Sequence, residues 1–176
     1  MQEASEGAES PPLLYREVQW NTIPWVWAVL LGIAALMWYG FYVQIVGGTP
    51  FGSNPASDRF MVLLTAIFGG SFQAAILFLH LVTEVRPASI RVRLVPFPWR
   101  RIPFRDIASY EVRTYSALRE YGGWGIRLGR NGKAYNMKGS SGIQLVLASG
   151  ERILIGTQEP EAFIEAIQAA RGAERA

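Results

Sequence analysis

Two runs of 24 residues without Lys, Arg, Asp or Glu dominate the first half of the chain, at 23–46 and 60–83. An α-helix rises about 1.5 Å per residue, so each run would form a helix of roughly 36 Å, enough to cross a bilayer core of about 30 Å. Gly-Gly, Thr-Pro and Asn-Pro pairs between them predict a loop over 47–59, external to the cell. Two runs of this length favour transmembrane helices over the alternative, a buried helical hairpin in a soluble protein.

The first 22 residues show no apolar period. They carry four Glu against one Arg, and Gly, Ser and Pro fill much of the remainder. A segment of low hydrophobicity and biased charge buries too little apolar surface to fold. Residues 1–22 are therefore predicted to be a disordered acidic tail, and their acidic start differs from the basic start of a secretory signal.

After residue 86 the pattern alternates with a period of two, which is typical of strands. Strands are predicted at 90–97, 107–115, 124–128, 134–137, 143–147 and 153–155. Asn131-Gly132 predicts a hairpin, because both residues tolerate a positive φ. The period becomes helical from Pro160 to Gly172. The segment 87–172 is thus predicted to be an α+β domain, an antiparallel β barrel or sandwich capped by a C-terminal helix.

The distribution of basic residues predicts the orientation. Residues 86–176 contain 15 Lys and Arg against 8 Asp and Glu, whereas the loop 47–59 has a single Arg beside an Asp. Basic residues concentrate on the cytoplasmic side of membrane proteins. We therefore expect a protein of the inner or plasma membrane with two spans, whose N- and C-termini are both cytoplasmic.

The composition excludes several chemistries. The chain has no Cys and a single His, His80, so it has no disulfide, no Cys zinc site and no pair of His side chains for acid–base work. His80 lies near the end of the second apolar run, where a polar side chain reaching the lipid headgroups is expected. We predict no catalytic residues, no metal and no cofactor, and that the protein is not an enzyme.

Several short motifs of the C-terminal half resemble those of the bacterial pleckstrin-homology-like domain. They are Gly122–Arg127, Ala134–Asn136, Lys138-Gly139, Gly142–Leu147, Gly150, Leu154–Thr157 and Glu159–Glu161. The resemblance covers about residues 88–172 and extends to small proteins in which two membrane spans precede such a domain, an uncharacterised family. It implies a curved antiparallel sheet capped by a C-terminal helix, cytoplasmic and tethered to the membrane. It implies no shared catalytic residues.

A Trp/Arg cluster follows the second apolar run by about fifteen residues. It consists of Trp99, Arg100 and Arg101, with Arg105 nearby. Each Arg near an anionic leaflet contributes about 1 kcal/mol to membrane binding, and Trp favours the membrane interface. The cluster is therefore a candidate for binding lipid headgroups. The resemblance adds that a loop between the first strands binds headgroups in some pleckstrin-homology domains. The alternative is the general excess of basic residues on the cytoplasmic side, which needs no ligand.

Small residues four apart mark one face of each apolar run. Ala66, Gly70 and Ala74 share a helical face in the second run, and Ala28 and Gly32 share one in the first. Small side chains let helices approach closely in lipid, so these faces are predicted to pack helices within the hairpin, in a dimer or against a larger partner. The alternative is the ordinary richness of membrane helices in Gly and Ala.

The predicted function is that of a non-catalytic module at the cytoplasmic membrane face, which binds a protein partner or assembles with itself. A first alternative is recognition of anionic lipid headgroups by the Trp/Arg cluster. A second is an accessory subunit of a transporter or an envelope stress system, acting through the hairpin. Expected partners are membrane lipids and a protein, and not nucleic acid, because the basic residues concentrate beside the membrane.

Overall fold

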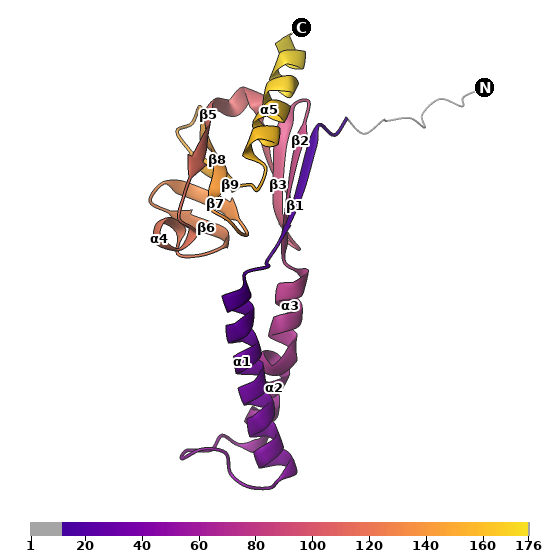
Figure 1. The fold of residues 1–176 in the computed structure, drawn as a ribbon, viewed down its shortest axis with the longest axis vertical. Coiled ribbons are helices and arrows are strands. Elements are labelled where there is room, and N and C mark those ends of the chain that lie inside the picture. The colour runs from indigo at the N-terminus through magenta and orange to yellow at the C-terminus, as the bar shows by residue number, and fades with distance from the viewer. Residues whose placement is uncertain (1–11, 176) are drawn as a thin grey trace, which may run out of the picture. The chain divides into compact units, whose positions relative to one another are not determined.

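The structure, a computed structural model, describes residues 12–175. It contains two compact units (Figure 1). The helical unit is Asn21–Leu79, and the β unit combines the residues up to Trp20 with those from His80 onward. The helical unit is thus an insertion into the sequence of the β unit.

Two long helices form the helical unit. Helix α1 (Pro24–Phe41) continues through a π-helical turn, η1 (Tyr42–Val46). The second consists of α2 (Asp58–Ala66), the π-helical turn η2 (Ile67–Ser71) and α3 (Phe72–Phe78). Both continuous helices are long and apolar enough to span a membrane, and only 17% and 11% of their most apolar windows are buried. This low burial disfavours the core of a soluble protein.

The second helix ends before the predicted residue 83. It stops at Phe78, and residues 80–86 form strand β2 (His80–Arg86) instead. Strand β2 is paired on both sides and buried on both faces, so its sequence reads as a continuous apolar run. The prediction that His80 lies in a membrane helix is therefore wrong, because long-range strand pairing places it in a sheet.

The first sheet has the order β1-β2-β3-β4 and is antiparallel throughout. Its other strands are β1 (Tyr15–Trp20), β3 (Ser89–Val95) and β4 (Arg100–Pro103). Strand β1 corrects the prediction of a disordered tail over 1–22: residues 15–20 are a strand whose side chains alternate between buried and exposed. The remainder of that prediction falls largely on residues 1–11, outside the described residues.

The second sheet has the order β5-β8-β9-β7-β6. After the 3₁₀ turn η3 (Phe104–Asp106), its elements are β5 (Ile107–Thr114), α4 (Ala117–Tyr121), β6 (Gly125–Gly129), β7 (Gly132–Asn136), β8 (Ser141–Leu147) and β9 (Arg152–Gly156). The predicted strands are confirmed to within two residues. The predicted hairpin is also confirmed, although its turn is Arg130-Asn131, because Gly129 pairs with Gly132. The parallel pair β7–β9 was not predicted.

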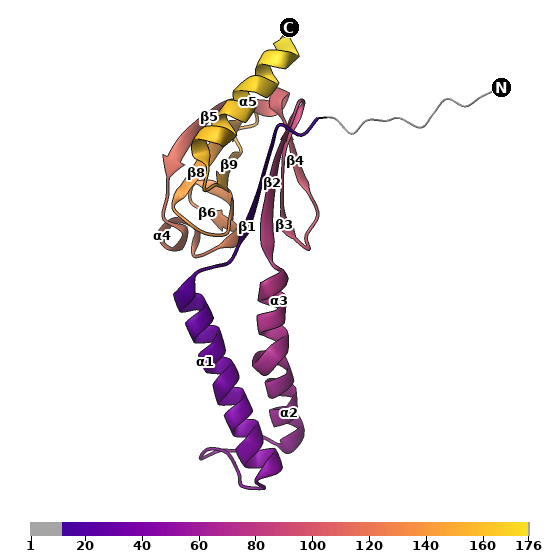
Figure 2. The same cartoon turned by 45° about the vertical axis from the view of Figure 1, so that its right-hand side comes forward.

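Helix α5 (Pro160–Arg175) confirms the predicted C-terminal helix and contacts strands of both sheets, β1, β2 and β8. Figure 2 shows it beside the two sheets. Its apolar face buries Phe163, Ile167 and Ala170 completely. The prediction left open a barrel or a sandwich, and the described strands form two separate sheets and no closed barrel, with mostly antiparallel pairing and a C-terminal helix as predicted.

A buried polar cluster attaches β1 to the rest of the β unit. Glu17 accepts hydrogen bonds from the Tyr15 hydroxyl (2.9 Å), the Thr157 hydroxyl (2.7 Å) and the backbone N–H of Gln158 (2.8 Å). The Gln19 side chain donates to the carbonyl of Gly156 (2.8 Å). Polar side chains therefore fix an edge strand that leads directly into α1.

Candidate functional site

The face of the first sheet that points away from the core carries most of its charge. Side chains alternate between the faces of a strand, and the strand register aligns them across the sheet. We call this the outer face; it comprises Arg16, Val18, Trp20, His80, Val82, Glu84, Arg86, Ser89, Arg91, Arg93, Val95, Arg101 and Pro103. It thus presents five Arg against one Glu.

Glu84 neutralises only part of this charge. Its carboxylate lies 3.0 Å from the guanidinium of Arg86 and 3.9 Å from that of Arg16. Within residues 12–175, no ion pair includes Arg91, Arg93 or Arg101. Buried polar atoms without a hydrogen-bond partner are rare, and an ordered water or a bound ion is one explanation for them.

Arg91 and Arg93 each have a buried nitrogen atom, Nε, without a hydrogen-bond partner among the described residues. Arg91 pairs in register with Arg101 on one side and with Glu84 on the other, and Arg93 lies two residues along β3 on the same face. Glu84 forms its ion pairs with Arg86 and Arg16, so these three arginines of β3 and β4 keep their charge unpaired among the described residues. This part of the outer face is suited to binding an anion.

Aromatic side chains lie beside these arginines, near the end of the sheet that leads to the helices. The guanidinium carbon of Arg93 lies 4.4 Å from the centre of the Trp99 ring, a cation–π contact. The Trp20 ring stacks on His80 at 4.3 Å between centroids. Trp20 is 47% exposed and Trp99 is 37% exposed, with Val18 also exposed. Exposed Trp beside Arg is the combination expected at a lipid interface.

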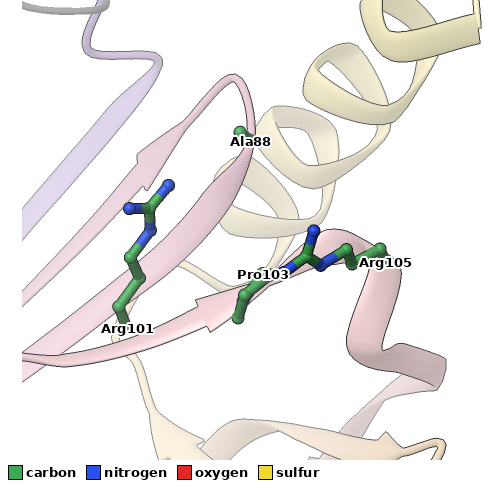
Figure 3. A pocket seen from close by; sticks show the side chains of 4 residues that line it. All are labelled: Ala88, Arg101, Pro103 and Arg105. Atoms are coloured by element: carbon green, nitrogen blue, oxygen red, sulfur yellow. The ribbon is translucent and has the colours of Figure 1, made fainter.

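A pocket of about 310 Å³ lies at the opposite end of the outer face, lined by Ala88, Arg101, Pro103 and Arg105 (Figure 3). The Nε–H of Arg101 donates to the Ser89 hydroxyl at 3.2 Å, which fixes that guanidinium. The Nε of Arg105 lies 3.7 Å from a carboxylate oxygen of Asp106. The wall of the pocket therefore contains two cations and no acidic side chain.

The model of a family of unknown function, DUF6141, matches residues 6–173. The chain belongs to the DUF6141 family. No curated protein matches the sequence. The match covers both the helical and the β unit of this chain.

The DUF6141 structure separates the four residues of the predicted Trp/Arg cluster. Trp99 contacts Arg93, and Arg101 and Arg105 line one pocket. Arg100 points to the other side of β4, where it forms an ion pair with Glu151 at 3.1 Å. The cluster was predicted as a loop, but strand β4 places its neighbouring arginines on opposite faces.

Sequence reasoning missed Arg91, Arg93 and Trp20 as members of one site. The alternation of Arg91 and Arg93 with Val92 and Leu94 was a usable signal, because it predicts both arginines on one face. The position of Trp20 was not predictable in the same way, since β1 is separated from β2 by the whole helical unit.

The five small residues that were predicted to pack helices lie outside the contact between the two helices of the DUF6141 hairpin. Ala28, Ala66 and Ala74 are exposed in the described hairpin, and a Cβ at Gly32 or Gly70 would meet nothing within 4 Å. The helices are joined by other residues: Trp38 donates to the Gly69 carbonyl, Thr65 to that of Met37 and Gln73 to that of Leu30. A role of the small-residue faces in a larger assembly stays a prediction.

Among residues 12–175, no group of three or more acidic or His side chains is placed to hold a metal ion. That the protein is not an enzyme, and that it takes no cofactor and no nucleic acid, stay predictions.

Proposed function

We propose that this DUF6141 protein is a membrane-anchored, non-catalytic binding module whose outer face binds the anionic headgroups of the bilayer that anchors it. One observation carries the proposal: Arg91, Arg93 and Arg101 have no carboxylate partner and lie on one sheet face with the exposed Trp20 and Trp99. The first alternative from the sequence, headgroup recognition, is thereby favoured, on a different set of residues.

Chain connectivity supports the proposal. Three residues separate Trp20 from the start of α1, and Leu79 alone separates α3 from β2. Both apolar helices thus continue directly into neighbouring strands that contribute to the outer face. The excess of Lys and Arg after residue 86 supports a cytoplasmic β unit, on the side where anionic lipids give the membrane surface a negative potential.

The resemblance to the bacterial pleckstrin-homology-like domain is part of this proposal. Two sheets with a C-terminal helix that contacts both agree with it. Two features depart from the expected antiparallel sheet. Strand β1 precedes the helical hairpin in the sequence, and β7 and β9 pair in parallel. The resemblance therefore supports a binding domain without transferring any ligand.

A reporter on the outer face tests the proposal. The chain has no Cys, so Val18→Cys introduces a single thiol that can be labelled with an environment-sensitive dye. The full-length protein is placed in nanodiscs of phosphatidylcholine alone or with phosphatidylglycerol. We expect brighter, blue-shifted emission in the anionic nanodiscs, reversed by salt. The same label at Val112→Cys, an exposed position on β5, is the control and should not respond.

Charge variants identify the groups responsible. Arg near an anionic surface contributes about 1 kcal/mol to binding, so Arg91→Gln together with Arg93→Gln should reduce the ratio of surface-bound to free β unit roughly 30-fold. Arg100→Gln on the opposite side of β4 should leave it unchanged. An equal Val18 signal in neutral and anionic nanodiscs would refute headgroup binding. If the Val18 label responded to the number of protein molecules per nanodisc rather than to the lipid, the response would identify self-assembly or a protein partner instead.

A further inference from the structure

We propose that the pocket between Ala88, Arg101, Pro103 and Arg105 is a binding site for a phosphate monoester. The inference rests on the proposed function for its place at one end of the anion-binding face. It adds the chemical class of the ligand, which a general attraction to an anionic surface does not specify.

The pocket is built from parts of the chain with separate structural roles. Arg101 belongs to β4, Arg105 to η3, and Ala88 to the turn between β2 and β3. Figure 3 shows the Arg105 side chain running back toward Pro103, with the Arg101 guanidinium beyond it. Since Ser89 holds the Arg101 Nε–H, the terminal NH₂ groups of that guanidinium are left to donate to a ligand.

Neither arginine has a buried ion-pair partner among the described residues. The Arg105 side chain is 82% exposed, and its contact with Asp106 is an exposed pair of the kind that adds little stability. Arg101 is exposed on an edge strand and, within the described part of the chain, forms no ion pair. Two guanidinium groups beside one pocket, with no acid in its wall, are explained by an anion that binds between them.

The number of donors selects the class of anion. A guanidinium group donates through a planar fork that matches two oxygens of one anion. A phosphate monoester has three terminal oxygens and a charge of about −1.5 to −2 at pH 7, so it can engage both forks at once. A carboxylate or a phosphodiester offers two such oxygens and a single charge. The volume of about 310 Å³ is at the lower end for small-molecule sites, which suits a headgroup or a small phosphorylated metabolite.

Titration with inorganic phosphate tests the site. The full-length protein in phosphatidylcholine nanodiscs is titrated in a calorimeter, and we expect saturable binding. Arg101→Gln or Arg105→Gln should weaken it at least tenfold, because each removes one fork. Arg105→Lys, which keeps the charge but loses the fork, should also weaken it, and Arg100→Gln should bind like the parent. Absence of saturable binding, or equal binding by the Arg105 variants, would overturn the proposal.

A second arm identifies the source of the phosphate. The titration is repeated in nanodiscs that contain phosphatidic acid, a monoester lipid, or phosphatidylglycerol, a diester lipid. Loss of the phosphate signal with phosphatidic acid alone assigns the site to a lipid headgroup, and retention with both lipids assigns it to a soluble ligand. Equal competition by both lipids would refute selectivity for a monoester.

These results are independent of the Val18 reporter. Phosphate binding with a silent reporter would retain the pocket and remove the membrane contact. A responsive reporter without phosphate binding would remove the pocket alone.

Discussion

Replacing Glu17 with Ala tests whether buried polar contacts hold β1 in place. Glu17 is 8% exposed and accepts three hydrogen bonds, from Tyr15, Thr157 and Gln158. In the described part of the chain it forms no ion pair. Burial raises the pKa of the Tyr15 hydroxyl, so that group stays a donor at neutral pH. The carboxylate is therefore stabilised by hydrogen bonds rather than by a neighbouring cation.

The expected loss of folding stability in Glu17→Ala follows from these contacts. A hydrogen bond to a charged group contributes about 1.5–3 kcal/mol, so three such bonds contribute roughly 5–9 kcal/mol. Removing the carboxylate also removes the cost of burying it, which is several kcal/mol. We expect Glu17→Ala to lower the free energy of unfolding of the β unit by about 2–4 kcal/mol, or its melting temperature by roughly 8–16 °C. Glu17→Gln keeps an acceptor for the Gln158 N–H and should cost only about 1 kcal/mol.

An introduced thiol at the fully buried Ala134 provides the assay. In an Ala134→Cys background, a thiol-reactive dye labels the full-length protein in detergent only when the β unit unfolds, so labelling against temperature gives the midpoint. Glu111→Ala, at an exposed position on β5, is the control and should leave the midpoint unchanged. If Glu17→Ala shifted the midpoint by less than about 2 °C, the polar cluster would not hold β1.

Two further predictions concern charge and helix packing. The backbone N–H of Ser116, and after it the charge of Arg113, lowers the pKa of Glu120, so its stabilisation is present at neutral pH and is lost as pH falls through the lowered pKa. Glu120→Gln should therefore lower the melting midpoint at pH 7, followed by intrinsic Trp fluorescence, and its difference from the parent should shrink as pH falls below 4.5; a difference that stays as large at acidic pH would contradict this. Gly69→Leu should separate the helices, because a Cβ there would lie 3.0 Å from the Trp38 indole nitrogen, whereas Gly70→Leu should be tolerated. The yield of a disulfide between cysteines introduced at Met37 and Thr65 measures the distance between the helices in each variant. Equal yields in the Gly69→Leu and Gly70→Leu variants would refute the assigned packing.

The candidate site was only partly predictable. The sequence identified a Trp/Arg cluster, and two of its members, Arg101 and Arg105, do share a pocket. It assigned Arg100 to the same site because neighbours in a loop are expected to act together, whereas in a strand they point to opposite faces. It left out Arg91 and Arg93, whose importance depends on which strands flank them.

By itself the sequence determined the elements whose signal is local. The two apolar helices follow from uncharged runs longer than a bilayer is thick, and the strands after residue 86 and the terminal helix follow from their periods. Only the tertiary structure decided the rest. Residues 15–20 become a strand and residues 80–86 leave the helix because each completes a ladder with the other across the helical insertion. That pairing joins residues far apart in sequence, so no local pattern encodes it, and it places Arg16 and Trp20 on the same outer face as the arginines of β3 and β4.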